Sequence, residues 1–191
     1  MNLVVNCSSD RLQLRIGTDY HEYPNQWLEL VFPQWLLQTI QHYNITHIYV
    51  INGPGSFTTL RVICLTINLY HNTHPWSISI TSCTKLELLH SLLSWRIDTI
   101  AIYIGQRNNV RLYNTNDNHH ILTTKSTLES DIIFDDVSDV YHSNQKVQWY
   151  IEWSYIGLKL NHTTIAQIEL DTIMKPSINL QPHYMIQPHV S

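Results

Sequence analysis

The sequence predicts an α/β protein, and three patterns along its 191 residues support that prediction. Short apolar runs, at residues 3–5 and 48–51, alternate with longer segments of helical periodicity. The second run leads into a turn rich in glycine and proline, and a long apolar segment at residues 60–70 follows it. A buried strand, a tight turn and a helix, in that order, are the repeating elements of α/β folds.

The first quarter of the chain is predicted to hold a hairpin and a helix. Residues 3–5 form a short buried strand, and alternation of apolar with polar residues indicates a half-exposed hairpin strand at Leu12, Leu14 and Ile16. Pro33 is expected in the first turn of the next helix, where its missing N–H costs little. One side of that helix then carries Leu36, Leu37, Ile40 and Tyr43.

The loop after the strand at residues 48–51 is the most informative part of the sequence. Two of the chain's five glycines, Gly53 and Gly55, flank Pro54 there, which indicates a tight turn. Ser56 or Thr58 is expected to cap the following helix by accepting from a free backbone N–H. The spacing matches neither a Walker A loop nor a nucleophile elbow. A structural role is therefore favoured over catalysis, although an exposed helix N-terminus could hold an anion.

The helix after this loop is predicted to be apolar on two sides. At about 100° per residue, one face holds Phe57, Leu60, Ile63, Cys64 and Ile67. A second stripe on the opposite side, which we call the outer stripe, holds Val62, Leu65 and Leu69. Such a helix is either buried twice within its own fold or buried once and used again at an interface. For a chain considered alone, the first alternative is the more common.

The rest of the chain continues the alternation of strands and helices. A strand is expected at residues 78–80, followed by a helix whose apolar face holds Leu86, Leu88, Leu89, Leu92 and Leu93. Beyond a break near residues 96–99, further strands are expected at residues 100–104, 110–113, 132–134 and 149–151. A short helix is expected at residues 164–173, ended by Pro176, with an extended tail that contains Pro182 and Pro188.

Composition argues against several classes of protein. The formal charge is −4, only 14% of residues are charged and no long basic block exists, so nucleic-acid binding by a charged patch is not expected. The N-terminus lacks a signal-peptide pattern and no apolar run reaches about 18 residues, which predicts a cytoplasmic protein without a membrane segment. Three widely spaced cysteines indicate reduced thiols rather than a disulfide framework. No cofactor is expected, and no metal is expected at the twelve histidines or at Asp135, Asp136 and Asp139.

Several stretches of the sequence resemble the bacterial TsaB (YeaZ) family. The most specific is Gly53-Pro54-Gly55-Ser56-Phe57-Thr58, followed by Leu60-Arg61, where that family typically reads GPGSFTGLR. Weaker matches lie at residues 3–9, 30–37, 102–113 and 182–185, so the resemblance covers nearly the whole chain. It implies a compact, two-lobed actin-like ATPase (ASKHA, RNase H-like) fold, with lobes at residues 1–97 and 98–191. It also implies that the loop is shaped by Gly53, Pro54, Gly55, Ser56, Phe57, Thr58 and Arg61.

The resemblance implies a non-catalytic scaffold. The TsaB family supports N6-threonylcarbamoylation of adenosine 37 in tRNA by binding TsaD, the transferase subunit, and TsaE, an ATPase, joins them. Contact with a TsaD-type subunit is expected at Trp35 and at the outer stripe, Val62, Leu65 and Leu69. Contact with tRNA is expected only through the complex, and the isolated chain could form a homodimer.

Departures from the family pattern fit a protein kept for its shape. Asn6 stands where the family usually has Asp, Thr59 replaces a glycine, and Gly105 replaces the Asp of its "DAR" motif. These changes remove two acids that could hold Mg²⁺. An ASKHA-type ATPase or a peptidase is therefore the less favoured alternative, and a diverged paralogue that pairs only with itself is a third.

Overall fold

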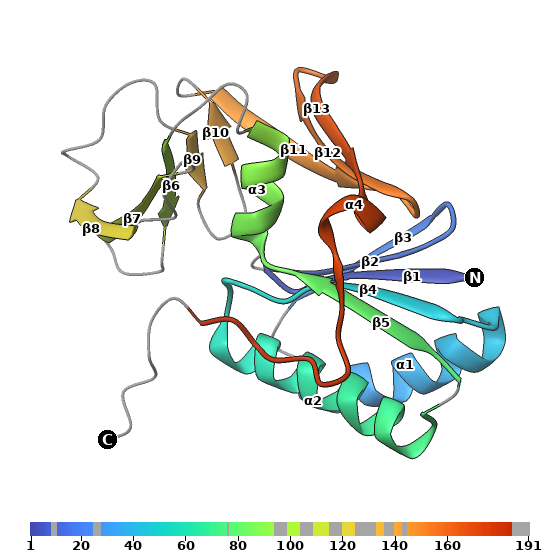
Figure 1. Ribbon diagram of the computed structural model, residues 1–191. Helices are drawn as coiled ribbons and strands as arrows, with labels where there is room; N and C mark the ends of the chain where they lie inside the picture. Colours follow the sequence, from blue (N-terminus) through green and yellow to red (C-terminus); the bar gives the residue numbers. More distant parts are fainter. Residues whose placement is uncertain are drawn as a thin grey trace, which may run out of the picture.

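The protein has a mixed α/β fold. The computed structural model describes residues 1–8, 11–24, 28–75, 77–93, 99–103, 109–114, 120–124, 133–135, 140–142 and 145–184. These residues form one sheet of six strands, one sheet of eight strands and four helices (Figure 1). The α/β class predicted from the sequence is confirmed.

The first sheet combines antiparallel and parallel strands. Its strands are β1 (Asn2–Asn6), β2 (Arg11–Ile16), β3 (Asp19–Pro24), β4 (His47–Ile51), β5 (Ser79–Cys83) and β14 (Lys175–Pro176). Their order is β14-β5-β4-β1-β2-β3, with β1, β2 and β3 antiparallel and with β4 and β5 parallel to β1. The predicted hairpin and the predicted strands at residues 3–5 and 48–51 are confirmed. The strand expected at residues 78–80 begins one residue later, at Ser79, and Ile78 lies buried just before it.

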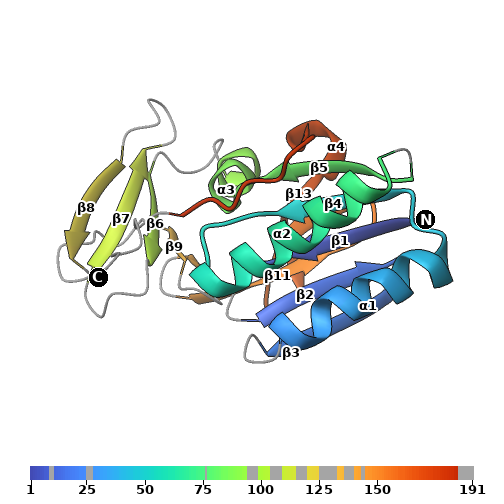
Figure 2. The same cartoon turned by 90° about the horizontal axis from the view of Figure 1, so that it is seen from below.

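Helices cover both faces of this sheet. α1 (Leu28–Tyr43) connects β3 to β4, and α2 (Phe57–Thr73) is the crossover between the parallel strands β4 and β5. The two helices lie side by side across one face (Figure 2). α3 (Lys85–Leu93) follows β5 and packs on the opposite face with the five leucines expected there, Leu86, Leu88, Leu89, Leu92 and Leu93.

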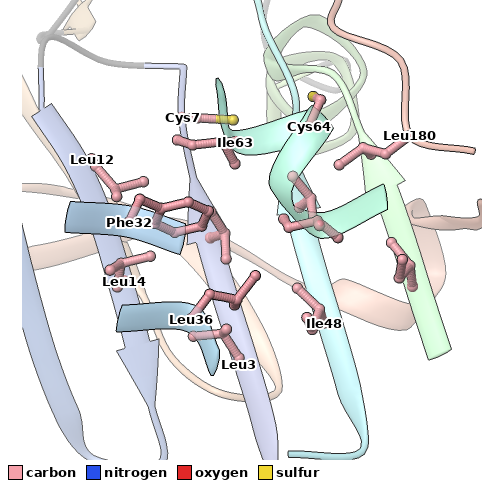
Figure 3. Close-up of a cluster of buried hydrophobic side chains, with 14 of the residues drawn as sticks. Leu3, Cys7, Leu12, Leu14, Phe32, Leu36, Ile48, Ile63, Cys64 and Leu180 are labelled. Atoms are coloured by element: carbon pink, nitrogen blue, oxygen red, sulfur yellow. The ribbon is translucent and has the colours of Figure 1, made fainter. Parts of the chain in front are cut away.

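The two central strands of the first sheet, β1 and β4, are apolar on both sides, and a separate cluster of side chains forms on each side. Leu3 of β1 and Ile48 of β4 point toward α1 and α2, where they meet Leu36 and Ile63 (Figure 3). The neighbouring residue Val4 points the other way, toward α3. This follows from the alternation of side chains along a strand, and it explains the near-continuous apolar runs in the sequence.

The second sheet packs against α3 through its first three strands in the spatial order. Its strands are β6 (Thr99–Tyr103), β7 (Asn109–Asn114), β8 (His120–Thr124), β9 (Ile133–Asp135), β10 (Val140–His142), β11 (Gln145–Ile151), β12 (Tyr155–Leu160) and β13 (Thr163–Glu169). The order is β13-β12-β11-β10-β9-β6-β7-β8. Val147, Ile156 and Leu158 join the cluster formed by α3 and Val4. The two sheets therefore share one apolar core.

The chain returns to the first sheet at its C-terminal end. After the short helix α4 (Leu170–Ile173), β14 pairs with β5 and the following residues, 177–184, run along α2 (Figure 1). Leu180 is almost fully buried beside α2 and β5 (Figure 3). The division into lobes at residue 97 remains a prediction, and residues 175–184 contact the first sheet.

The helix expected at residues 164–173 was a wrong prediction. Residues 163–169 form the strand β13, which pairs antiparallel with β12, and only Leu170–Ile173 are helical. Thr163, Thr164 and Ile165 are β-branched and favour the extended conformation. Pairing with β12, which was not predicted from the sequence, favours the strand over the helix for these residues.

Two expectations about α1 were also wrong. The helix begins at Leu28, so Pro33 lies inside it rather than in the first turn. Its missing N–H removes the bond to the carbonyl of Glu29, and burial of Leu28 and Phe32 favours the longer helix. Leu37 is exposed, because the buried face is centred on Phe32 and Leu36.

Some sequence predictions concern residues outside the described part of the chain. They include the boundary at residues 96–98, the loop at residues 115–119, and Ile104, Gly105, Ile132, Asp136, Asp139 and Pro188. The remaining parts of the predicted strands near residues 100, 110, 133 and 149 are confirmed as β6, β7, β9 and β11.

Candidate functional site

Gly53 accommodates the C-terminal tail. Its φ is 132°, in a region that favours glycine, and a Cβ added there would overlap the carbonyl oxygen of His183. The tail is held at this point because the His183 N–H donates to the Asn52 carbonyl at 2.8 Å. On the other side, the Gly53 N–H donates to Ser8 Oγ at 2.9 Å. The glycine therefore packs against the chain's own backbone.

Gly55 is required for a different reason. A Cβ at this position would lie 2.7 Å from the Cys7 carbonyl oxygen and 3.1 Å from Ser8 Cα. The loop thus lies directly on the end of β1, closer than any side chain permits. Both glycines of the loop therefore shape its contacts within the fold.

The expected side-chain cap on α2 is absent from the structure, so that prediction was wrong. Ser56 occupies the N-cap position, where its carbonyl accepts from the Leu60 N–H at 3.0 Å, but its hydroxyl makes no capping bond. Thr58 lies within the helix, so its own N–H is one of the groups that need a cap. Phe57 is exposed rather than buried, and its ring lies 4.8 Å from that of Tyr184. The start of the helix, where a hydroxyl cap was expected, is therefore contacted by the ring of a tail residue.

Two amide side chains clamp the tail to the first sheet and α2. Asn68 Nδ2 donates to the Leu180 carbonyl at 2.8 Å, while Asn68 Oδ1 accepts from the Leu180 N–H at 2.8 Å. Asn52 Nδ2 donates to the Gln181 carbonyl at 2.7 Å. These bonds satisfy backbone groups of a segment that itself belongs to no strand or helix.

The outer stripe is on the surface of the chain. The side chains of Leu65 and Leu69 are 57% and 68% exposed, and Val62 is partly buried. The opposite side of α2 is buried and holds Leu60, Ile63, Cys64 and Ile67. Of the two alternatives for a helix that is apolar on both sides, the structure excludes burial within the chain for Leu65 and Leu69.

Trp35 does not lie with the outer stripe. Its ring packs 6.1 Å from that of Phe32 and 6.3 Å from that of Tyr23, measured between centroids. His21, which like Tyr23 belongs to β3, lies 6.5 Å away. Trp35 therefore faces the β2–β3 hairpin, whereas the outer stripe belongs to α2. Arg61, also expected to shape the loop, is exposed on α2.

The carboxyl ends of the parallel strands carry polar groups that bond to one another. Asn6 Nδ2 donates to Gln13 Oε1 at 2.9 Å, and Asn6 Oδ1 accepts from the Ser8 N–H at 3.0 Å. The buried Lys85 Nζ donates to the Ser8 carbonyl at 3.2 Å and lies 5.6 Å from the Trp149 ring. Asn6 thus acts as a donor and an acceptor inside the fold, a role that a carboxylate could not fill.

Thr84 and Glu87 form a capping box at the start of α3. Glu87 Oε2 accepts from the Thr84 N–H at 2.8 Å, and Thr84 Oγ1 accepts from the Glu87 N–H at 3.1 Å. Burial raises the pKa of Glu87, but the bonds from Thr84 and the nearby Lys175 outweigh it and hold the pKa below its ordinary value. Glu87 is therefore an ionised cap, which explains its position beside the strand ends.

A contact between a serine and a histidine was missed in the sequence. Ser79 Oγ lies 2.7 Å from His47 Nδ1, and His47 Nε2 lies 3.0 Å from Thr81 Oγ1. The two residues are direct neighbours in the β4–β5 register but 32 positions apart in sequence, so only the strand pairing reveals them. Burial lowers the pKa of His47, with Asp171 opposing this shift. Both ring nitrogens thus lie beside hydroxyl groups, and among the described residues no carboxylate bonds to the imidazole as in a catalytic triad. The nearby Asp171 instead accepts from the Tyr49 hydroxyl at 2.8 Å.

The three cysteines are buried free thiols. Burial raises the pKa of each, to about 12 for Cys64, so the reactive thiolate is disfavoured. In the ranges that the structure describes, no three His, Cys, Asp or Glu side chains gather in a way that could hold a metal ion. None of the helices in those ranges is long and apolar enough to cross a membrane.

Comparison with known proteins gives only distant likenesses. No protein-family model matches the sequence, and no curated protein matches it. Among solved structures, the chain is similar to YeaZ from Pseudomonas aeruginosa, with 13% sequence identity and a TM-score of 0.41 over 67% of this chain and 68% of that one. It is also similar to an uncharacterised protein described as having similarity to peptidase YeaZ from Pseudomonas aeruginosa, with 12% identity and a TM-score of 0.40 over the same shares. At these values neither likeness decides the function.

Proposed function

We propose that this chain is a non-catalytic scaffold subunit of the TsaB type. It binds a TsaD-type transferase subunit and so supports the N6-threonylcarbamoyladenosine modification of tRNA. A TsaE-type ATPase joins the same complex, and tRNA contacts the chain only through it. The observation that carries the proposal is the exposure of the outer stripe, with Leu65 57% and Leu69 68% exposed on a helix whose other side is core.

The geometry of the outer stripe suits a partner helix. Leu65 and Leu69 are four residues apart and therefore stack along one line of α2, with Val62 one turn earlier. Large side chains in such a row supply the apolar anchors that carry most of the binding energy in helix-mediated contacts. Further exposed leucines, Leu30 and Leu37, lie on the adjacent helix α1.

The rest of the site supports a scaffold rather than an enzyme. The glycines of the loop at residues 53–58 pack against Cys7, Ser8 and His183, and the ends of β1 and β4 are tied to each other and to the tail. The proposal retains the compact two-lobed actin-like (RNase H-like) fold, which the parallel β1, β4 and β5 with the α2 crossover support.

The experiment that tests the proposal is the mass of the chain in solution. The purified protein is measured by light scattering alone and after mixing with the TsaD-type subunit of the same organism. The proposal expects a complex with one copy of each subunit. Masses that remain those of the separate proteins at micromolar concentration would contradict it, and a mass of two copies for the chain alone would identify the homodimer.

The contact between Ser79 and His47 favours a second candidate, a peptidase. A hydroxyl 2.7 Å from an imidazole nitrogen has the geometry of a nucleophile beside its general base. In the part of the chain that the structure describes, both nitrogens of the imidazole contact hydroxyls and neither contacts a carboxylate, so we expect neither peptidase nor ATPase turnover from the isolated chain. Steady turnover that disappears in Ser79→Ala would support the peptidase, and loss in Ser56→Ala or Asp135→Ala would point to the loop or to an acidic site.

A further inference from the structure

A pocket lies between α1 and the β2–β3 hairpin, away from the outer stripe. Its volume is about 280 Å³, and the side chains that form it include Leu12, Leu14, Tyr23, Val31, Phe32 and Trp35. Leu12 and Leu14 of β2 face Phe32 of α1 in Figure 3, and all three are almost fully buried. These residues form the floor of the pocket. No residue of α2 takes part in its lining among the described residues.

The pocket opens at Val31. This side chain lines the pocket and is also 45% exposed to solvent, so it stands at the boundary between the two. Three aromatic rings also line the pocket. The Phe32 and Trp35 rings are stacked with an interplanar angle of 20°, and the Tyr23 ring meets that of Trp35 at 63°.

Polar atoms contribute almost nothing to the wall of the pocket. A polar or charged group placed inside would lose its bonds to water and gain none from the protein, which is unfavourable. Water itself needs polar partners to stay in such a space, and an apolar cavity of about 150 Å³ in another protein stays dry and binds benzene. The wall of the pocket therefore favours apolar ligands, because it offers polar and charged ligands no replacement for their hydrogen bonds to water.

We propose that this pocket binds a neutral, apolar small molecule that carries an aromatic ring system. Its volume admits more than one ring, and the faces and edges of Tyr23, Phe32 and Trp35 offer the offset and edge-on contacts that aromatic rings prefer. The site is independent of the proposed scaffold function, since its residues belong to the hairpin and to the opposite side of α1 from the one that carries Leu30 and Leu37.

The test uses the neutral fluorescent probe N-phenyl-1-naphthylamine and two matched variants. Val31→Trp fills the opening of the pocket. Leu30→Trp adds the same side chain at the neighbouring position, which is 76% exposed and outside the lining. We expect saturable binding with a stoichiometry of one to the natural protein and to Leu30→Trp, and at least tenfold weaker binding to Val31→Trp. Should circular dichroism show that Val31→Trp is misfolded, Val31→Phe gives the same test with a smaller side chain.

A competition experiment tests the chemistry of the ligand. Naphthalene should displace the probe, whereas 1-naphthoate should need at least a tenfold higher concentration because its carboxylate must be desolvated. Three results would overturn the proposal: no saturable binding to the natural protein, equal binding to the two variants, or equal competition by the neutral and charged compounds.

Discussion

At the scale of single residues, the two glycines of the loop lie so close to other backbone atoms that neither position has room for a side chain. Gly53 has a positive φ and lies against the His183 carbonyl, whereas Gly55 allows the loop to contact the Cys7 carbonyl oxygen. The sequence predicted a tight turn here, but not which atoms the glycines approach. Those atoms belong to β1 and to the C-terminal tail, which are distant in sequence.

We predict that Gly55→Val destabilises the fold. The new side chain would begin 2.7 Å from the Cys7 carbonyl oxygen, a backbone atom that cannot move without displacing β1. Overpacking of this kind costs about 1–3 kcal/mol, which urea denaturation can measure. Gly17→Asn is the control, because Gly17 has nothing within 4 Å and Asn tolerates a positive φ. A midpoint for Gly55→Val equal to that of the natural protein would show that the close approach is absent.

The partly buried imidazole of His47 predicts a dependence of stability on pH. Burial lowers the pKa of His47 in the folded state, whereas the unfolded chain has the ordinary value of about 6.5. Below that pH the unfolded state binds the proton more readily, so the free energy of unfolding should decrease as the pH falls through about 6.5. In His47→Gln this decrease should be smaller. An identical pH profile for the two proteins, measured by urea denaturation from pH 7.5 to 5, would refute the assignment.

At the scale of elements, the sequence predicted those that are specified by local pattern. Apolar runs and helical periodicity identified β1, β4, α2 and α3. Each of these elements carries an apolar face that becomes buried whichever neighbour it packs against. The β12–β13 hairpin was missed because its residues mix β-branched and polar types, which fit either a helix or a strand. The pairing between the two strands selects the strand conformation. For the same reason the contact between Ser79 and His47 could not be predicted.

The clamp on the tail is an element-scale feature that a single substitution tests. Asn68→Ala would leave the N–H and the carbonyl of the buried Leu180 without these partners, at a cost of about 1–3 kcal/mol. Asn72→Ala, at an exposed position of the same helix, should change the free energy of unfolding by less than about 0.5 kcal/mol. If the two variants unfold at the same urea concentration, the tail does not depend on this clamp.

At the scale of the whole molecule, the two central strands of the first sheet, β1 and β4, are buried on both faces. α1 and α2 cover one face, and α3 with the second sheet covers the other, where Val4 meets Ile156 and Leu158 (Figures 1 and 2). The sequence could not predict this shared core, because it joins residues more than a hundred positions apart. The outer side of α1 and α2 is exposed, and the outer stripe lies there.

The measurement that tests the central claim most directly is the affinity of Leu65→Asp for the TsaD-type subunit. Because Leu65 is 57% exposed, the variant should fold with an unchanged circular dichroism spectrum. At an interface the buried carboxylate and the lost apolar contact should weaken binding at least tenfold, for which about 1.4 kcal/mol suffices.

Trp153→Asp is the matched control, because Trp153 is 54% exposed and follows β11 in the second sheet. It should bind like the natural protein. A folded Leu65→Asp whose affinity equals that of Trp153→Asp would contradict the claim that the outer stripe binds the partner.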